Sequence, residues 1–365
     1  MHSVEHMSIR RHLRLVDKLM LLTAFAVAAS LFLSVGWMAV APSDPQGAVS
    51  LLTHENPALM VVEALALAAV TASLATLIAG TRLPDVGIFA VALGLALTSI
   101  RGGTATYLLI TMADGDSGAE RLLAGQLAGE ALIWTGVLFL SMVICGWVTR
   151  HFQNGDAEST LGSSQSEYAT HPVLLTELSA TECPGVSRRL GVVAEASRPL
   201  SARLAGLKTT LVTALVAMFA FNVLVSGRVP QSIKHGQVIF AVIAAFFLGV
   251  WISKKWFACR TAFWSLLAVP IVAVLGYSWA VSANASGGKY ADLANLPMSD
   301  FLRATPIAFI AAGAMGVLTA RWIVSDNPPN PLLVLAAGGP MSAEDFGRSN
   351  RPSPRKTVKK SGKRR

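Results

Sequence analysis

The sequence predicts an all-α polytopic membrane protein with eight transmembrane helices, and three observations support this fold class. Hydrophobic residues make up 53% of the 365 positions and charged residues only 14%, whereas soluble domains carry about 25% charged residues. The apolar residues gather in eight stretches, each long enough to cross a bilayer. Because backbone groups in hydrocarbon must find their hydrogen bonds within their own segment, each stretch is expected to be a helix.

The predicted helices occupy most of the chain outside one central loop and the two ends. The first has a basic lead like that of a signal peptide, but its apolar run is about twice the usual length, so we expect a retained anchor. The third begins at Pro84, whose missing N–H costs nothing in a first helical turn. In chain order, the predicted helices are residues 19–41, 58–80, 84–100, 122–148, 206–227, 236–253, 262–283 and 304–324.

The distribution of basic residues predicts the orientation, because Lys and Arg are enriched in cytoplasmic loops. With the N-terminus in the cytoplasm, 24 of the 30 Lys and Arg residues fall on the cytoplasmic side and six on the opposite side. An even number of helices then returns the C-terminus to the cytoplasm. The lack of targeting signals favours a bacterial-type inner membrane.

The spacing of the helices predicts two parallel four-helix repeats. In each half, about twenty non-cytoplasmic residues separate the third helix from the fourth. Residues 135–138 (Thr-Gly-Val-Leu) also resemble residues 315–318 (Met-Gly-Val-Leu). Four helices per unit give both copies the same orientation, about an axis along the membrane normal. Repeats of this kind occur in transporters and in membrane proteins that transport nothing.

Two carboxylates lie well inside predicted helices and are the candidate intramembrane polar residues. Glu63 and Glu130 fall at a similar depth, and Arg101 ends the third helix at the same face. An unpaired charge is costly in the bilayer, so the three are expected to converge as a polar cluster. One interpretation is an outward-facing site for a proton, a cation or a cationic substrate. The other is a buried ion pair, or a protonated Glu, that only holds helices together.

Other polar and small residues in the helices indicate packing. Gln126 and Asn222 are candidates for hydrogen bonds that bridge helices. Gly125 and Gly129 form a G-x-x-x-G motif, which suits close helix contact. Pro270 predicts a kink in the seventh helix.

No catalytic, cofactor-binding or metal-binding residues are predicted. The sequence lacks a G-x-S-x-G motif, an H-E-x-x-H motif and a Gly-rich phosphate loop. None of the seven histidines falls inside a predicted helix, and the three cysteines (Cys145, Cys183 and Cys259) form no C-x-x-C pair. An enzymatic activity is therefore not expected.

The segments outside the helices are basic and poor in large apolar residues. The central loop is too small for an independent enzyme domain. The tail is expected to be disordered and to contact anionic lipid headgroups, whereas nucleic acid is a less favoured partner. The predicted organisation is a basic cytoplasmic N-terminus (1–18), a first four-helix unit (19–149), a partly disordered cytoplasmic loop (150–205), a second four-helix unit (206–324) and a basic disordered tail (325–365). The predicted headgroup contacts are Arg355, Lys356, Lys359, Lys360, Lys363, Arg364 and Arg365.

Two classes of function remain open for an integral membrane protein of this composition. The slightly favoured one is a transporter or permease for a small molecule or an ion, with a path between the two units. The alternative is an envelope-assembly or interaction scaffold that uses the cytoplasmic loop and the basic tail. A membrane-protein partner or a homo-oligomer is compatible with either class.

Overall fold

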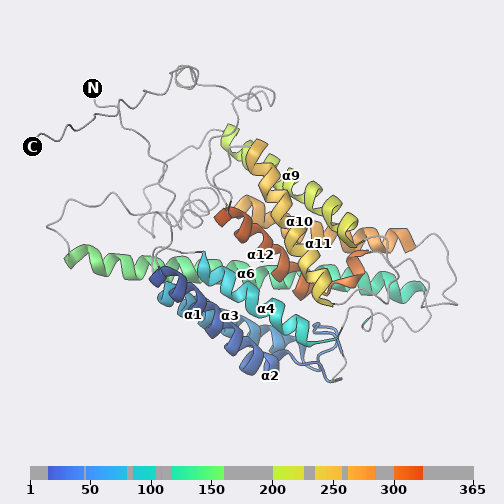
Figure 1. The fold of residues 1–365 in the computed structure, drawn as a ribbon. Coiled ribbons are helices and arrows are strands. Elements are labelled where there is room, and N and C mark those ends of the chain that lie inside the picture. Colours follow the sequence, from blue (N-terminus) through green and yellow to red (C-terminus); the bar gives the residue numbers. More distant parts are fainter. Residues whose placement is uncertain are drawn as a thin grey trace, which may run out of the picture.

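The computed structural model describes residues 15–44, 47–79, 85–103, 108, 117–159, 200–225, 235–256, 262–284 and 300–323. Every regular element in these ranges is helical, which confirms the predicted all-α class (Figure 1). The elements are α1 (Leu15–Leu31), the π-helical turn η1 (Phe32–Gly36), α2 (Trp37–Val40), α3 (Pro57–Ala79), α4 (Val86–Arg101), α6 (Ser117–Ser159), α9 (Leu200–Val225), α10 (His235–Trp256), α11 (Ala262–Asn284), the 3-10 turn η4 (Asp300–Arg303) and α12 (Pro306–Ile323).

Six helices are long and apolar enough to cross a membrane, and two further apolar helices are shorter. The pattern is consistent with a multi-pass helical membrane protein. The six long apolar segments are Lys18–Val40, Pro57–Ala79, Gly125–Thr149, Gly206–Val225, His235–Trp256 and Pro306–Ile323, and the two shorter ones are Val86–Arg101 and Phe263–Trp279.

Each predicted helix corresponds to one of these segments, but some ends differ. The helix predicted at 122–148 extends in both directions, as Ser117–Ser159. Its apolar part fits the prediction, and the helix continues beyond it through polar residues. Apolar composition therefore predicts the apolar part of the helix but not its polar extension.

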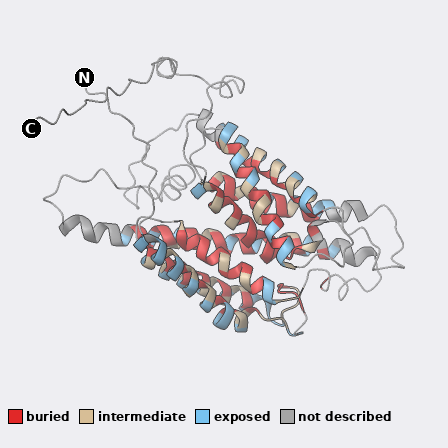
Figure 2. Ribbon diagram, in the orientation of Figure 1, coloured by how far each residue is buried: buried red, intermediate tan, exposed pale blue. Residues whose placement is uncertain are grey.

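Two helices lie at the centre of the bundle and are buried along most of their length. Most residues of α4 and of α12 are buried, whereas α1, α3 and α9 keep one exposed apolar face (Figure 2). Exposed apolar faces on the outside are expected where lipid surrounds a protein. The central pair, α4 and α12, packs together directly.

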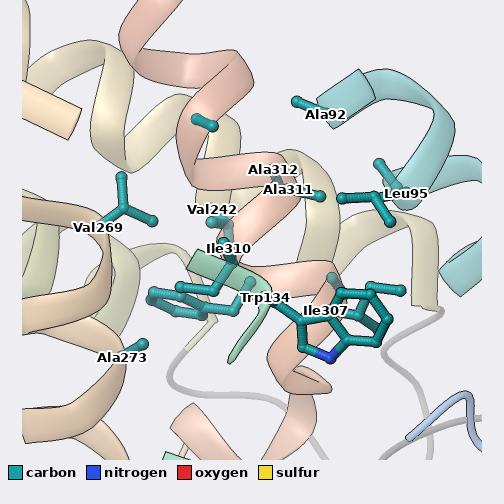
Figure 3. Close-up of a cluster of buried hydrophobic side chains, with 14 of the residues drawn as sticks. Ala92, Leu95, Trp134, Val242, Val269, Ala273, Ile307, Ile310, Ala311 and Ala312 are labelled. Carbon is teal, nitrogen blue, oxygen red and sulfur yellow. The ribbon is translucent and has the colours of Figure 1, made fainter. Parts of the chain in front are cut away.

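The core is apolar where α4, α6 and α12 meet. Leu95 of α4, Trp134 of α6 and Ile307 of α12 are almost fully buried and lie at this junction (Figure 3). α10 and α11 contribute Val242 and Val269 to the same cluster. The helices of the two predicted units thus share one continuous core.

The two ends of the bundle are named here by residues of α4. At the Arg101 end, α4 ends and α12 begins, and a contact between Ser99 and Thr305 joins them. At the Asp85 end, α4 begins and α12 ends, and Asp85 contacts Arg321. The two central helices are therefore antiparallel and matched in length.

Glycine allows one especially close approach in the second half. A Cβ atom at Gly316 of α12 would overlap the backbone carbonyl oxygen of Ile243 on α10. Gly136 of α6 differs, because a Cβ atom there would have no neighbour within 4 Å. The two positions therefore provide a matched pair for testing the packing of α12.

We expect Gly316→Ala to lower the stability of the protein by about 1–3 kcal/mol, because backbone cannot move aside as a flexible side chain can. Gly136→Ala should leave the stability unchanged or raise it slightly, through helix propensity. Thermal unfolding of both variants in detergent measures the difference. Equal stabilities would contradict the close contact between α10 and α12.

Candidate functional site: a buried carboxylate beside the central helices

Glu130 of α6 is the one acidic or basic residue that is fully buried in the described part of the chain, with 3% of its surface exposed. It lies at the Arg101 end of the bundle, one helical turn before Trp134. Burial of a carboxylate in an apolar surrounding is costly unless hydrogen bonds compensate. The partners of Glu130 therefore define the site.

Three neutral groups surround the carboxylate. Ser50 Oγ lies 2.5 Å from Glu130 Oε2, and Trp134 Nε1 donates to Oε1 at 2.9 Å. The backbone N–H of Leu51 is a third hydrogen-bonding partner. Both carboxylate oxygens are thus satisfied without a cationic side chain.

Two of these partners belong to a segment that folds back into the end of the bundle, residues 47–53, which we call the mouth loop. Residues 48–51 are buried although they belong to no helix. The Gly103 N–H donates to the Gly47 carbonyl oxygen at 2.8 Å, and Thr53 Oγ1 donates to the Ala48 carbonyl oxygen at 2.8 Å. The mouth loop is held in place by these bonds and covers Glu130.

The three predicted cluster residues lie at the same end of the bundle but have separate surroundings. Glu63 is half-buried on α3, and Arg101 is exposed at the end of α4. No hydrogen bond or ion pair between described residues joins Glu63, Arg101 and Glu130 to one another. The site at Glu130 is built instead from Ser50, Leu51 and Trp134.

Arg101 connects α4 to the π-helical turn of the first helix. Its Nη1 donates to the Leu33 carbonyl oxygen at 2.7 Å, and its guanidinium lies 4.4 Å from the centre of the Trp37 ring. A π-helical turn interrupts the regular pattern of backbone hydrogen bonds. Arg101 therefore satisfies a backbone carbonyl in this turn rather than a carboxylate.

The remaining residues predicted from the sequence occupy less central positions. Gln126 is exposed on α6, and Asn222 is half-buried on α9. Gly125 and Gly129 face open space, so their G-x-x-x-G motif makes no helix contact within the described chain. The predicted headgroup residues, 355–365, and Cys183 and Cys259 lie outside the described residues.

Further polar side chains join the central helices near the site. Ser99 Oγ of α4 lies 3.1 Å from Thr305 Oγ1 and 3.5 Å from His235 Nε2 of α10. Tyr277 of α11 donates its hydroxyl to the Ala304 carbonyl oxygen at 2.8 Å. α4, α10, α11 and the residues just before α12 thus contribute polar groups at the Arg101 end.

At the Asp85 end, an ion pair joins the same two central helices. Arg321 Nε lies 3.5 Å from Asp85 Oδ2, and the two side chains are 17% and 14% exposed. Burial raises the pKa of the Asp85 carboxyl, and the neighbouring Arg321 opposes this shift. Cys145 is buried near this ion pair, and its Sγ atom lies close to Gly87 of α4.

A small apolar pocket lies between the two ends, where α4, α6, α11 and α12 meet. Its volume is about 20 Å³, and its lining includes Thr135, Met142, Pro270 and Ala314. This is room for about one water molecule and too little for an organic solute. Pro270 lies inside α11 and has no N–H for the carbonyl of Leu266, which also lines the pocket.

The described side chains show no arrangement suited to a metal ion: within these ranges, no three His, Cys, Asp or Glu residues come together. Comparison of the chain with protein-family models, with curated proteins and with solved structures finds no match. The site is therefore interpreted from its own geometry.

We expect Trp134→Phe to destabilise the protein by about 1–2 kcal/mol, because it removes a hydrogen bond to a buried carboxylate while keeping the aromatic ring. Trp147→Phe is the control, since Trp147 lies on the same helix with 63% of its surface exposed. Thermal unfolding in detergent compares the two. If both variants unfold at the same temperature, the Trp134–Glu130 bond contributes nothing measurable.

The ion pair at the Asp85 end should control the reactivity of Cys145. In a Cys183→Ser/Cys259→Ser background, we expect Asp85→Asn to speed labelling of Cys145 by a polar maleimide on the order of fivefold. An ion pair worth about 1 kcal/mol shifts an opening equilibrium by about that factor. Labelling in lipid nanodiscs, which expose both faces, measures the rate.

The exchanged pair Asp85→Arg/Arg321→Asp is the control, because it restores opposite charges at the two positions. Its labelling rate should return toward that of the parent protein. An unchanged rate in Asp85→Asn would show that the pair does not close this end of the bundle.

Proposed function

We propose that this integral membrane protein transports a small solute or an ion across the bacterial-type inner membrane, along the seam between two four-helix units. The buried carboxylate of Glu130 carries the proposal. It lies on α6, which packs against α11 and α12 of the second unit, and it has no cationic partner among the described residues. Ionisable groups inside a membrane protein are costly and commonly mark a pathway for ions or substrates.

Eight membrane spans are part of the proposal, and the matched central helices support them. α4 is short, with 16 residues. Its two ends are nevertheless joined to the two ends of α12, through Ser99–Thr305 and Asp85–Arg321. Because α12 is long enough to cross a bilayer, α4 reaches through the same depth. Eight spans put both termini on one side, and the excess of Lys and Arg favours the cytoplasm for that side.

The arrangement of the helices supports two repeats. In the first unit, α1 and α6 each pack against both α3 and α4, and in the second unit α9 and α12 each pack against both α10 and α11. Between the units, α4 packs against α12 as α11 packs against α6. Exchanging the units leaves all these contacts in place, as expected for a two-fold axis along the membrane normal.

The contact between α3 and α4 has no counterpart of similar extent in the second unit. The matching residues also differ in their surroundings, since Gly316 contacts α10 whereas Gly136 faces open space. The helix arrangement, rather than the short sequence matches, therefore carries the proposal of a duplication.

The seam has the features of a closed path. One polar contact between α4 and α12 joins the units at each end, and the pocket between these contacts is small and apolar. Polar contacts can be exchanged for water when two units separate, while apolar surface between them resists leakage. Opening one end at a time would expose the seam, and Glu130 beside it, to one side of the membrane.

Water access to the seam tests the proposal. In a background without native cysteines, Thr135→Cys places a thiol at the pocket, and Gly136→Cys places one at the same depth on the lipid-facing side of α6. A charged thiosulfonate reagent reacts with thiolates in water, not with thiols facing lipid. In nanodiscs, we expect labelling of Thr135→Cys and little labelling of Gly136→Cys.

An unreactive Thr135→Cys would contradict a transport path and favour the alternative, an interaction scaffold with a permanently packed core. Glu55→Cys places a thiol in the exposed segment just before α3, and its labelling is the positive control for the reagent. Reaction of Thr135→Cys and Gly136→Cys at equal rates would also contradict a path confined to the seam.

A further inference from the structure

We propose that Glu130 is a proton-binding site and that the ion coupled to transport is therefore H⁺. This inference rests on the proposed transport function and names the ion that the same site takes up. It follows from the groups that surround the carboxylate and from the space available there.

The partners of Glu130 exclude a metal ion or an organic ammonium in this arrangement. Leu51 and Trp134 present N–H groups, which donate hydrogen bonds and have no lone pair for a cation. Among these three partners, only Ser50 Oγ could coordinate a cation. A metal ion would have to displace the mouth loop and the indole together, whereas a proton needs no additional volume beside a side chain that is 3% exposed.

The site can hold the carboxyl group in both protonation states. When ionised, the carboxylate accepts hydrogen bonds from Ser50, Leu51 and Trp134. When a proton binds, an O–H bond forms on Oε2, and this hydroxyl can donate to Ser50 Oγ, because a serine hydroxyl both donates and accepts. Leu51 and Trp134 continue to donate to the remaining lone pairs. Ser50 is therefore the partner that adapts when the proton arrives or leaves.

No described charge neutralises Glu130, so a bound proton is what removes its charge inside the bilayer. α3 contributes Glu63, which is half-buried and does not contact Glu130. α4 contributes Arg101, which bonds to Leu33. α11 contributes Tyr277, an uncharged neighbour close enough to interact electrostatically.

The other titratable groups near these elements are directed elsewhere. Arg321 of α12 lies at the opposite end, beside Asp85. Arg303 of η4 donates to the Val225 carbonyl oxygen. The mouth loop has no titratable side chain, and it is followed by His54, which is half-buried, and Glu55, which is exposed.

Infrared difference spectroscopy tests whether Glu130 gains and loses a proton. With the full-length protein in lipid, a pH step should produce a protonated-carboxyl C=O band that is absent from Glu130→Gln. Glu63→Gln is the matched control, since it removes the other intramembrane carboxyl group, and it should keep the band. A band that persists in Glu130→Gln, or no titrating band in the parent protein, would overturn the proposal.

Proton flux tests whether this proton is coupled to movement across the bilayer. In liposomes that contain a pH-sensitive dye and carry an imposed membrane potential, the parent protein and Glu63→Gln should move protons. Glu130→Gln should fall to the rate of protein-free liposomes. Equal flux with Glu130→Gln would overturn the proposal.

If Glu130→Gln does not fold, Ser50→Ala replaces it in the infrared experiment, because this variant keeps the carboxyl group. It removes the group to which the protonated form donates, and should therefore shift the C=O frequency of the band. An unshifted band would overturn the assignment of the band to Glu130. Failure of this inference can be told apart from failure of the transport proposal. If Thr135→Cys is labelled but Glu130 gives no titrating band, the protein has a path without proton coupling. If Thr135→Cys is not labelled, the path itself is contradicted.

Discussion

The hydrogen bonding of one carboxylate inside the bilayer is the constraint on which the Arg101 end of this structure depends. Water cannot solvate Glu130, so the chain itself supplies the donors, from a loop before α3 and from the next turn of α6. This requirement explains why a loop segment is buried as deeply as the helices around it. The mouth loop and the turns of α6 that carry Glu130 and Trp134 are arranged around this polar group.

Other backbone and hydroxyl groups that are removed from water also find hydrogen-bond partners within the protein. Arg101 satisfies a carbonyl in the π-helical turn, and Tyr277 satisfies one at the start of α12. Several buried threonines donate to the carbonyl four residues earlier in their own helix, as Thr76 and Thr135 do. Polar groups in the bundle are thus paired locally, and the polar contacts that join α4 to α12 lie at the ends of these two helices.

The sequence was sufficient to predict the helices because a bilayer restricts both composition and secondary structure. It was sufficient to single out Glu130, since a carboxylate in an apolar helix is conspicuous. It could not predict Ser50 as its partner, because the return of a loop into the bundle leaves no periodic pattern. Arg101 appeared to be a partner for the acids, but it bonds to a carbonyl in a π-helical turn that apolar composition does not reveal. The polar end of α6, through Ser159, was also missed, because its polar residues carry no apolar signal.

The length of α6 has a mechanical consequence. Its 43 residues span about 65 Å at 1.5 Å per residue, roughly twice the thickness of the hydrocarbon layer. Glu130 lies in the part at the Arg101 end, and Ser159 lies about 44 Å farther along the same continuous helix. A tilt of about 5° at Glu130 displaces the far tip by about 4 Å, as the geometry of a rigid rod requires. A rigid α6 would therefore act as a lever that converts a small motion around a buried carboxylate into a larger displacement beyond the opposite face of the bundle.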